Sequence, residues 1–293
     1  MTQTFTTVGL IGIGHIGLPL SVNLLGSGLK VIGYGKDNLD AFAKAGGTVA
    51  ASAADVAART DVILHSLPTE DALEDVVHGP AGILKTLRPG TTVIELSTYS
   101  LEAKQRLAKT LSDAGAALLD CEMSGTPPMV AAKKNLILVS GERALAERMQ
   151  PLLLRGAAKA PYIGPLGTSL KLKLVNNMLG AVHVMAAAEA IHLAGKAGID
   201  PQAALEALGG GASSSVHLLQ RGPRMVSHDY AASEGPLGLF WKYLELGPIL
   251  AKEANAPTPM FDTALRYFKQ ALDAGRGGED ISVVFDMLRQ ERP

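Results

Sequence analysis

Apolar residues in the first part of the chain gather in short runs, and stretches with the apolar spacing of a helix lie between them. The runs predict strands over residues 7–13, 30–34, 62–66, 92–96, 117–120 and 135–140. The stretches predict helices over residues 16–27, 39–45, 72–77, 101–114 and 143–153. Strands that are apolar throughout are covered on both faces, and their alternation with helices is typical of a doubly wound parallel sheet. We therefore expect an α/β fold in this part of the chain.

The pattern changes after Gly167, where strand-like runs cease and helical spacing continues to the end. The spacing predicts one long helix over residues 168–197, with Gly198 as its stop signal. Shorter helices are expected over residues 201–208, 237–254, 260–274 and 281–290, with Pro248 splitting the second of these and a flexible loop over 209–215. We therefore predict two domains, an α/β domain over residues 1–165 and an all-helical domain over 166–293.

Composition narrows the class of protein. The chain of 293 residues is 47% hydrophobic and 4% aromatic, so its core is aliphatic, and 27 Lys and Arg stand against 28 Asp and Glu. A balanced charge argues against a nucleic-acid-binding or membrane-surface protein. The single cysteine, Cys121, excludes an internal disulfide and suits a reducing compartment, and the sequence shows no metal-ligand spacing. The N-terminus has no secretory pattern, and polar residues interrupt the apolar stretch 174–195, so we expect a soluble, cytoplasmic protein.

The segment Gly12-Ile13-Gly14-His15-Ile16-Gly17 follows an apolar strand and opens a helical pattern. In that context Gly12 permits a tight turn, Gly14 lets the backbone approach a pyrophosphate, and Gly17 allows the helix to pack closely on the strand. The N-terminus of the helix adds amides and a partial positive charge. We predict that residues 12–17 bind a dinucleotide, with His15 over the phosphates; the alternative is a structural turn.

The end of the second predicted strand bears on the choice of nicotinamide cofactor. An NAD site usually has Asp or Glu about 20 residues after the glycine motif, on the ribose 2′-hydroxyl. Here that position is Gly35, and Lys36 follows it, where a cation is able to pair with a 2′-phosphate. We favour NADP over NAD, although Asp37 would serve the ribose of NAD if the register were different by a residue.

The long predicted helix carries the candidate acid/base. Lys173 and Asn177 are four residues apart and share one helical face, whereas Lys171 points elsewhere. A lysine among leucines is partly desolvated, which lowers its pKa toward the range useful for proton transfer near neutrality. The alternative is an ordinary lysine whose head reaches solvent.

The whole chain resembles the β-hydroxyacid dehydrogenase family, of which 3-hydroxyisobutyrate dehydrogenase is a member. The resemblance lies in the glycine motif with Asn23-Leu24 and Gly28, in Asp120-Cys121-Glu122-Met123-Ser124-Gly125-Thr126, which is similar to the family's D-A-P-V-S-G-G loop, and in Gly164 to Gly167 with Lys173, Asn176 and Asn177. The segment Lys242-Tyr243-Leu244-Glu245-Leu246 is similar to the family's K-D-L-x-L, and residues 275–282 are similar to its G-x-G-x-x-D-x-S ending.

The resemblance implies a Rossmann-type domain followed by a helical domain, and a hydride transfer between a nicotinamide cofactor and a small 3-hydroxy acid or its semialdehyde. Lys173 would be the general acid/base, and Asn177 would orient it. Ser124, Gly125 and Thr126 would hold the substrate carboxylate, and Lys242 would close over substrate and cofactor. Residues beside the cofactor would be Leu67, Pro68, Ser97 and Thr98. No metal is implied.

The sequence departs from the family pattern around the expected substrate. Glu122-Met123 stands where the family has Pro-Val, Thr126 replaces a glycine, Pro127-Pro128 stiffens the next turn, and Ser169 and Tyr243 replace a glycine and an aspartate. These departures leave the glycine motif and Lys173 intact. They indicate a working enzyme whose acid substrate differs from the usual ones, unless they are drift.

Two other functions stay open. Imine reductases have a similar scaffold but usually lack the lysine, and a non-catalytic cofactor-binding module would be expected to lose it. The helical domain is too short for a full-size 6-phosphogluconate dehydrogenase. The apolar stretch 174–195 indicates a homodimer or homotetramer.

Overall fold

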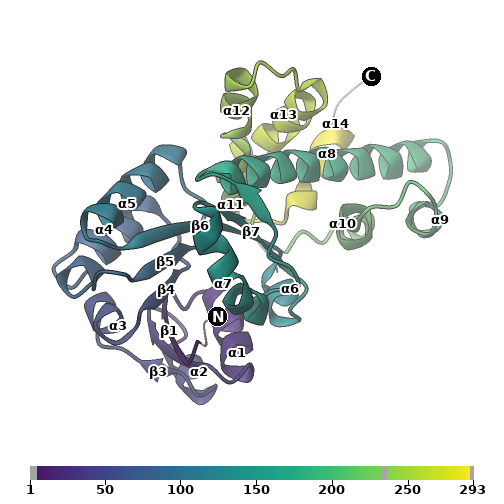
Figure 1. Ribbon diagram of the computed structural model, residues 1–293. Helices are drawn as coiled ribbons and strands as arrows, with labels where there is room; N and C mark the ends of the chain where they lie inside the picture. Colours follow the sequence, from purple (N-terminus) through teal and green to yellow (C-terminus); the bar gives the residue numbers. More distant parts are fainter. Residues whose placement is uncertain (1–4, 232–235, 291–293) are drawn as a thin grey trace. The chain divides into compact units, whose positions relative to one another are not determined.

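A computed structural model describes residues 5–231 and 236–290 (Figure 1). Contacts along the chain divide it into two compact units, Met1–Lys173 and Leu174–Pro293. The first unit contains a single sheet of eight strands: β1 (Thr7–Ile11), β2 (Lys30–Tyr34), β3 (Thr48–Val49), β4 (Val62–His65), β5 (Thr92–Glu95), β6 (Ala117–Ser124), β7 (Leu136–Ser140) and β8 (Tyr162–Gly164).

The sheet has the order β3-β2-β1-β4-β5-β6-β7-β8. Strands β1 to β6 are parallel, as the alternation of strands and helices predicts. The strand order reverses between β1 and β4, and ligands of open α/β sheets bind beside such a point, at the carboxyl ends of the strands. The doubly wound α/β fold expected from the sequence is therefore confirmed.

Strand β7 is an exception to the predicted parallel direction, because it pairs with β6 in the antiparallel direction. The connection between them, residues 125–135, contains only the short helix α6 (Pro127–Ala131). A parallel crossover takes about a dozen residues or more, usually with a full helix across the sheet. The chain therefore turns back beside β6, and β8 then pairs with β7 in parallel.

Helices cover both faces of the sheet (Figure 1). One apolar core joins the sheet to α1 (Gly17–Gly26), α2 (Leu39–Lys44), α6 and α7 (Arg143–Gly156). The other joins it to α3 (Ala53–Arg59), α4 (Glu70–His78), the 3-10 turn η1 (Ile83–Lys85) and α5 (Leu101–Asp113). Burial of both faces explains why these strands are apolar without alternation.

The sequence pattern did not predict β3, α3, α6, β8 or the helix α10 (Val216–Ser227). Helix α3 is rich in alanine and has little apolar periodicity, so its start depends on Ser52, whose side chain accepts a hydrogen bond from the Asp55 amide. Ser215 caps α10 in the same way, through the Leu218 amide. The loop predicted over 209–215 is shorter in the structure, since α9 (Pro201–Gly210) continues into it.

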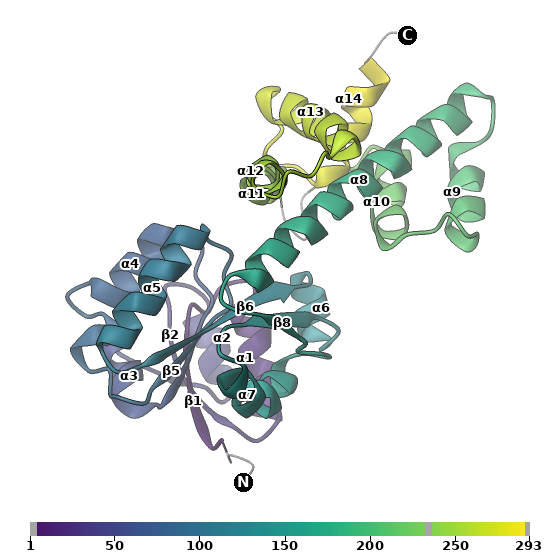
Figure 2. The ribbon, with the colours of Figure 1, turned by 45° about the horizontal axis from the view of Figure 1, so that its top comes forward.

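Helix α8 (Thr168–Lys196) crosses the division between the units and is one continuous helix, as predicted. Gly198 follows it with a positive φ of 81°, a conformation that ends helices. Figure 2 shows its length. By length and composition alone α8 resembles a membrane span. Its residues Ala181, Val184, Ala188 and Ile191 are buried in the core of the second unit, which identifies it as a core helix.

The other elements described in the second unit are helical: α9, α10, α11 (Leu237–Leu244), α12 (Gly247–Glu253), α13 (Pro259–Asp273), η2 (Ile281–Val283) and α14 (Val284–Gln290). Pro248 lies in the first turn of α12 and separates it from α11, so the predicted split is confirmed.

The predicted first strand is shorter in the structure. It ends at Ile11 and not at residue 13, because Gly12 turns the chain with a φ of 97°.

Candidate active site

The three glycines between β1 and α1 differ in what surrounds them. A Cβ on Gly12 would lie 2.0 Å from the Ser66 carbonyl oxygen, and one on Gly17 would lie 1.8 Å from the Gly12 carbonyl oxygen. Both glycines are therefore needed for close backbone packing. A Cβ on Gly14 would meet no described atom within 4 Å, so the space beside Gly14 is open. The turn fits a dinucleotide whose pyrophosphate approaches Gly14.

The neighbouring residues complete the turn. Ile13 is buried in the core, His15 is exposed, and α1 starts after Ile16 without a side-chain cap. A helix start without a side-chain cap leaves first-turn amides for an anionic ligand. Asn38, which follows β2 with a φ of 58°, donates from its amide to the Ile13 carbonyl oxygen at 2.9 Å. This bond ties the loop that contains Lys36 to the glycine turn.

The end of β2 offers no buried acid. Gly35 lies against Ile13, where a Cβ would be 2.9 Å from the Ile13 nitrogen, and the side chains of Lys36 and Asp37 are exposed. Lys36 therefore lies outside the core, two residues before Asn38, whose amide is bonded to the glycine turn. This position is compatible with a role at the ribose end of a dinucleotide.

Two loops at the carboxyl ends of β4 and β5 are joined by hydrogen bonds. The Leu67 amide donates to the Ser97 hydroxyl at 2.8 Å, and the Tyr99 hydroxyl donates to the Leu67 carbonyl oxygen at 3.4 Å. Pro68 is exposed and follows Leu67 directly. The structure therefore brings together Leu67 and Ser97, two of the residues predicted beside the cofactor.

A buried pair of side chains at the ends of β4 and β5 supports these loops. His65 at the end of β4 and Glu95 at the end of β5 are fully buried, with His65 Nδ1 3.2 Å from Glu95 Oε2. The other carboxylate oxygen of Glu95 accepts a hydrogen bond from the Ser97 amide at 2.8 Å. A buried pair whose oxygens are all engaged holds one geometry, so it positions Ser97.

The predicted carboxylate-binding turn lies at the end of β6. Ser124 is its last residue, Gly125 follows with a φ of 153°, and Thr126 precedes α6 as the N-cap residue. The Thr126 side chain makes no cap hydrogen bond in the described structure, so its hydroxyl is not committed to the helix. Hydroxyls and amides in such a turn suit a carboxylate.

Lys173 reaches the same strand end from α8. Its amine Nζ donates to the Met123 carbonyl oxygen at 2.9 Å, so it lies beside the residue before Ser124. Burial lowers the pKa of Lys173, and the negative charge of Glu122 acts in the opposite direction. Lys171 is exposed, as the helical spacing predicts.

Asn177 and Lys242 belong to the second unit. Asn177 is one turn beyond Lys173 on α8 and is 6% exposed, and its Nδ2 has no hydrogen-bond acceptor among the described residues. A buried donor without a partner is costly, so this amide is available for a further hydrogen bond. Lys242 lies on α11 with an exposed side chain.

Behind Lys173 lies a cluster of buried charges that sequence reasoning missed. Lys104 of α5 is fully buried and donates to Asp120 Oδ1 at 2.5 Å and to Glu122 Oε1. Burial acts to lower the pKa of Lys104, but the two carboxylates outweigh burial and raise it. Glu122 also accepts from the Thr98 hydroxyl at 2.5 Å, and this bond connects the cluster to the predicted cofactor loop.

The signal for this cluster was present in the sequence. Charged residues interrupt otherwise apolar strands at His65, Glu95, Asp120 and Glu122, and such residues need buried partners. Cys121, between the two acids, is buried, and burial raises the pKa of its thiol. Among the described residues no group of three or more His, Cys, Asp or Glu is placed to hold a metal ion.

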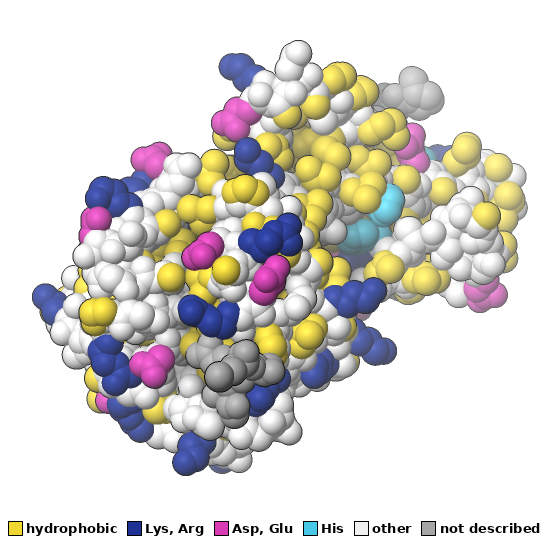
Figure 3. All heavy atoms as spheres, viewed as in Figure 1, with side chains coloured by type: hydrophobic (Ala, Val, Ile, Leu, Met, Phe, Trp, Pro, Cys, Tyr) yellow, Lys and Arg dark blue, Asp and Glu magenta, His cyan; other side chains and the backbone are white. Residues whose placement is uncertain are grey.

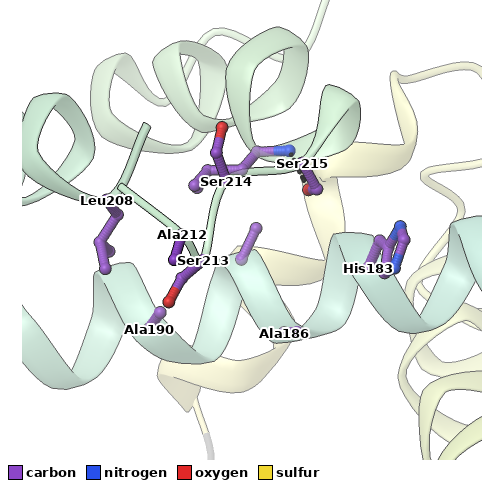
Figure 4. A pocket seen from close by; sticks show the side chains of 10 residues that line it. His183, Ala186, Ala190, Leu208, Ala212, Ser213, Ser214 and Ser215 are labelled. Carbon is purple, nitrogen blue, oxygen red and sulfur yellow. Dashed lines mark hydrogen bonds between the residues drawn. The ribbon is translucent and has the colours of Figure 1, made fainter. Parts of the chain in front are cut away.

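A hollow of about 280 Å³ lies wholly inside the second unit (Figure 4). Alanines and His183 of α8 form one wall, and Ser213, Ser214 and Ser215 of the loop before α10 form the other. It starts ten residues beyond Lys173, about 15 Å of helix. The hydroxyl of Ser215 caps α10 by accepting a hydrogen bond from the Leu218 amide.

Comparisons with known proteins agree with this geometry. Residues 7–164 match the family model described as the NAD binding domain of 6-phosphogluconate dehydrogenase, and residues 167–288 match that described as NAD-binding of NADP-dependent 3-hydroxyisobutyrate dehydrogenase. The chain is 29% identical to 2-(hydroxymethyl)glutarate dehydrogenase of Eubacterium barkeri, over 97% of this chain and 95% of the relative. It is 31% identical to L-threonate dehydrogenase of Cupriavidus necator, over 96% and 95%.

Solved structures show the same fold. A 3-hydroxyisobutyrate dehydrogenase from Salmonella typhimurium superimposes with a TM-score of 0.85 at 29% identity, covering 96% of this chain and 99% of that one. An imine reductase from Pseudomonas sp. covers 97% of this chain and 100% of its own, with a TM-score of 0.61 at 22% identity, which shows a shared fold alone. Two family models and full-length relatives leave one assignment: the chain belongs to the β-hydroxyacid dehydrogenase family and is an NAD(P)-dependent oxidoreductase.

Proposed function

We propose that this enzyme interconverts a small 3-hydroxy acid and its semialdehyde, with Lys173 as general acid/base. The observation that carries the proposal is the hydrogen bond from the Lys173 amine to the Met123 carbonyl oxygen, which holds the amine beside the Ser124 to Thr126 turn. A carboxylate bound at that turn would place the neighbouring carbinol within reach of the amine. Relatives named for hydroxymethylglutarate and L-threonate act on acids of this general kind.

Each residue then has a chemical task. A nicotinamide cofactor, when bound, accepts or supplies the hydride. Lys173 moves the proton at the substrate oxygen, a contribution worth about 10²- to 10⁴-fold in rate. Its lowered pKa, caused by burial, suits that exchange. Asn177 would use its unpartnered Nδ2 to orient the substrate oxygen, and Ser124, Gly125 and Thr126 would bind the carboxylate.

The cofactor would lie along the switch point between β1 and β4. Gly12 to Gly17 would hold the pyrophosphate, Leu67 and Pro68 with Ser97 and Thr98 would border the nicotinamide, and Lys242 would close over substrate and cofactor.

The predicted domain 1–165 would bind the cofactor, and the predicted domain 166–293 would serve substrate binding and oligomerisation. We place the enzyme in the cytoplasm.

An activity panel of 3-hydroxy acids, their semialdehydes and cyclic imines, with NADP(H) and NAD(H), tests the reaction type. Turnover confined to hydroxy acids and aldehydes supports the proposal. Turnover of imines would favour the imine reductase alternative, and cofactor binding without turnover of any compound would favour a non-catalytic module. Glu122, Met123 and Thr126 stand at the substrate end, so we expect the best substrate to differ from 3-hydroxyisobutyrate.

We propose that NADP is preferred over NAD, because Lys36 is an exposed cation at the end of β2, where Gly35 leaves no acid for a ribose 2′-hydroxyl. Replacing Lys36 by alanine should reduce kcat/KM for NADP by about tenfold and leave kcat/KM for NAD unchanged within about twofold, since the lost partner is the 2′-phosphate. Steady-state kinetics with both cofactors gives the ratio. Lys30, exposed at the start of β2, is the control, and its alanine variant should keep the wild-type ratio.

We further propose that a second copy of the chain covers part of α8. Leu172, Val175 and Leu179 lie at helical spacing and are 38%, 44% and 49% exposed. Apolar side chains gather over the helical unit in the view of Figure 3. An apolar stripe of this kind on a soluble helix marks an interface.

The oligomer has a direct test in light scattering coupled to size exclusion. Wild type should elute as a dimer or tetramer, and Leu179→Lys should shift toward monomer because it places a charge in the stripe. The matched control is Leu154→Lys, at a leucine of α7 that is 40% exposed, and it should leave the mass unchanged. A monomeric wild type at micromolar concentration would refute the interface.

A further inference from the structure

The buried carboxylate of Glu122 has no counterpart in the family pattern, which has proline there, and it lies in the layer directly behind the proposed acid/base. Glu122 and Met123 are consecutive residues of β6, and the Met123 carbonyl oxygen receives the hydrogen bond from the Lys173 amine. The Glu122 side chain points to the α5 side, where its two oxygens accept from Lys104 and from the Thr98 hydroxyl. One strand segment therefore touches the amine, the cofactor loop and the buried cation.

The charges around Glu122 show which group acts on Lys173. Lys104 is bound by two carboxylates, and Asp120 is also engaged with the Gly167 amide at 3.1 Å and with the Ser140 and Ser169 hydroxyls at 2.9 and 2.8 Å. Two acids on one cation leave one negative charge in excess in a region without bulk water. Glu122 is the charged group that opposes the lowering of the Lys173 pKa by burial. Further ionisable groups near the cluster are Glu95 with its partner His65, Tyr99, Cys121 and Glu70.

We propose that Glu122 is a positioning residue for proton transfer: its buried carboxylate is one residue from the carbonyl group that holds the Lys173 amine, and its charge favours the ammonium that donates a proton to the carbonyl oxygen of a semialdehyde. This inference rests on the proposed function of Lys173 as the acid/base. The same carboxylate accepts the hydrogen bond of the Thr98 hydroxyl, so consecutive residues of β6 hold the cofactor loop and the Lys173 amine. Burial raises the pKa of Glu122 itself, while the Lys104 ammonium and the Thr98 hydroxyl work against that rise.

The test is the Glu122→Gln variant, which keeps the shape of the side chain, removes the excess negative charge and leaves Lys104 paired with Asp120. In the reductive direction the alkaline limb of the kcat profile should move to lower pH, and kcat at a fixed pH above that limb should fall by about tenfold, because less of Lys173 is protonated. KM for the semialdehyde and the dissociation constant of NADPH, measured by fluorescence, should stay within about twofold. A change in KM and cofactor affinity with an unmoved limb would show a structural role and overturn the inference.

A second readout is independent of turnover. Competitive labelling of Lys173 with a small acylating reagent, followed by peptide mass spectrometry across pH, reports its ionisation in the cofactor-free enzyme. The titration of Lys173 should move to lower pH in Glu122→Gln, and Glu122→Asp should lie between that variant and wild type. The matched comparison, Asp120→Asn, removes the other acid of the cluster and should move the titration less than Glu122→Gln does, because Glu122 is the charged group that acts on Lys173. Should Glu122→Gln fail to fold, an unshifted titration in Glu122→Asp would contradict the inference.

The role of Lys173 and the role of Glu122 can be refuted separately. If Lys173→Ala retains activity, the proposed function fails whatever Glu122 does. If Lys173→Ala is inactive but Glu122→Gln leaves both the limb and the labelling titration unchanged, only the role of Glu122 fails.

Discussion

Replacing Lys173 by alanine lowers kcat by about 10²- to 10⁴-fold in both directions, the range expected for the loss of a positioned acid/base. The amine that is lost lies 2.9 Å from the Met123 carbonyl oxygen, beside the predicted carboxylate turn. The glycine turn and the loops after β4 and β5 are built by other residues, so the dissociation constant of NADPH should stay within about threefold of wild type. Steady-state kinetics and fluorescence titration measure the two quantities.

Lys171→Ala is the matched control, because Lys171 is on the same helix two residues earlier and its side chain is exposed. It removes the same charge and the same methylenes without touching β6, and we expect kcat within about twofold of wild type. Near-normal activity of Lys173→Ala, or an equal loss in both variants, would remove Lys173 from the mechanism.

Replacing Lys104 by methionine lowers the free energy of unfolding by about 3–5 kcal/mol at pH 8, the cost typical of breaking a buried ion pair from one side. Methionine nearly matches the lysine in volume, so the loss is electrostatic: Asp120 and Glu122 stay fully buried without their shared cation. Urea denaturation followed by circular dichroism measures the difference. Burial raises the folded-state pKa of Glu122, and without Lys104 the rise is no longer opposed by that cation, so the deficit should shrink as pH falls and this acid takes up a proton.

Lys109→Met is the comparison, since Lys109 is on the same helix and pairs with Asp113 in solvent, with side chains 76% and 65% exposed. Its loss should change stability by no more than about 0.5 kcal/mol at any pH. If Lys104→Met were as stable as Lys109→Met at pH 8, the buried cluster would not be ionic in the folded protein.

The features that sequence reasoning placed correctly are those fixed by local chemistry. The glycine turn follows from spacing between a strand and a helix, and α8 follows from its apolar pattern, its length and the glycine after it. Helical geometry predicts that Lys173 and Lys171 face different ways, and the family resemblance then selects Lys173. The split at Pro248 likewise depends on a single residue that cannot continue a helix.

What sequence reasoning missed depends on contacts between distant segments. Lys104 looks like an ordinary helix lysine until the fold places Asp120 and Glu122 against it, and Glu122 appeared only as a departure from a family pattern. The reversal at β7 depends on the length of a loop relative to the sheet, which apolar runs do not encode. Helices α3 and α10 begin at serine caps, signals too short to stand out from an alanine-rich or serine-rich background.

The pH dependence of kcat/KM in the two directions, compared between wild type and Lys173→Ala, tests the central claim most directly. Reduction needs the Lys173 ammonium as donor, so its rate should fall as pH rises through the pKa of that amine; oxidation needs the neutral amine, so its rate should rise through the same value. Because burial lowers the pKa of Lys173, the shared limb should lie below the ordinary range for lysine. We expect kcat/KM of wild type to change with pH in opposite senses in the two directions, and the residual activity of Lys173→Ala to lack this dependence on pH. The same pH dependence in both proteins would contradict the role of Lys173 as acid/base.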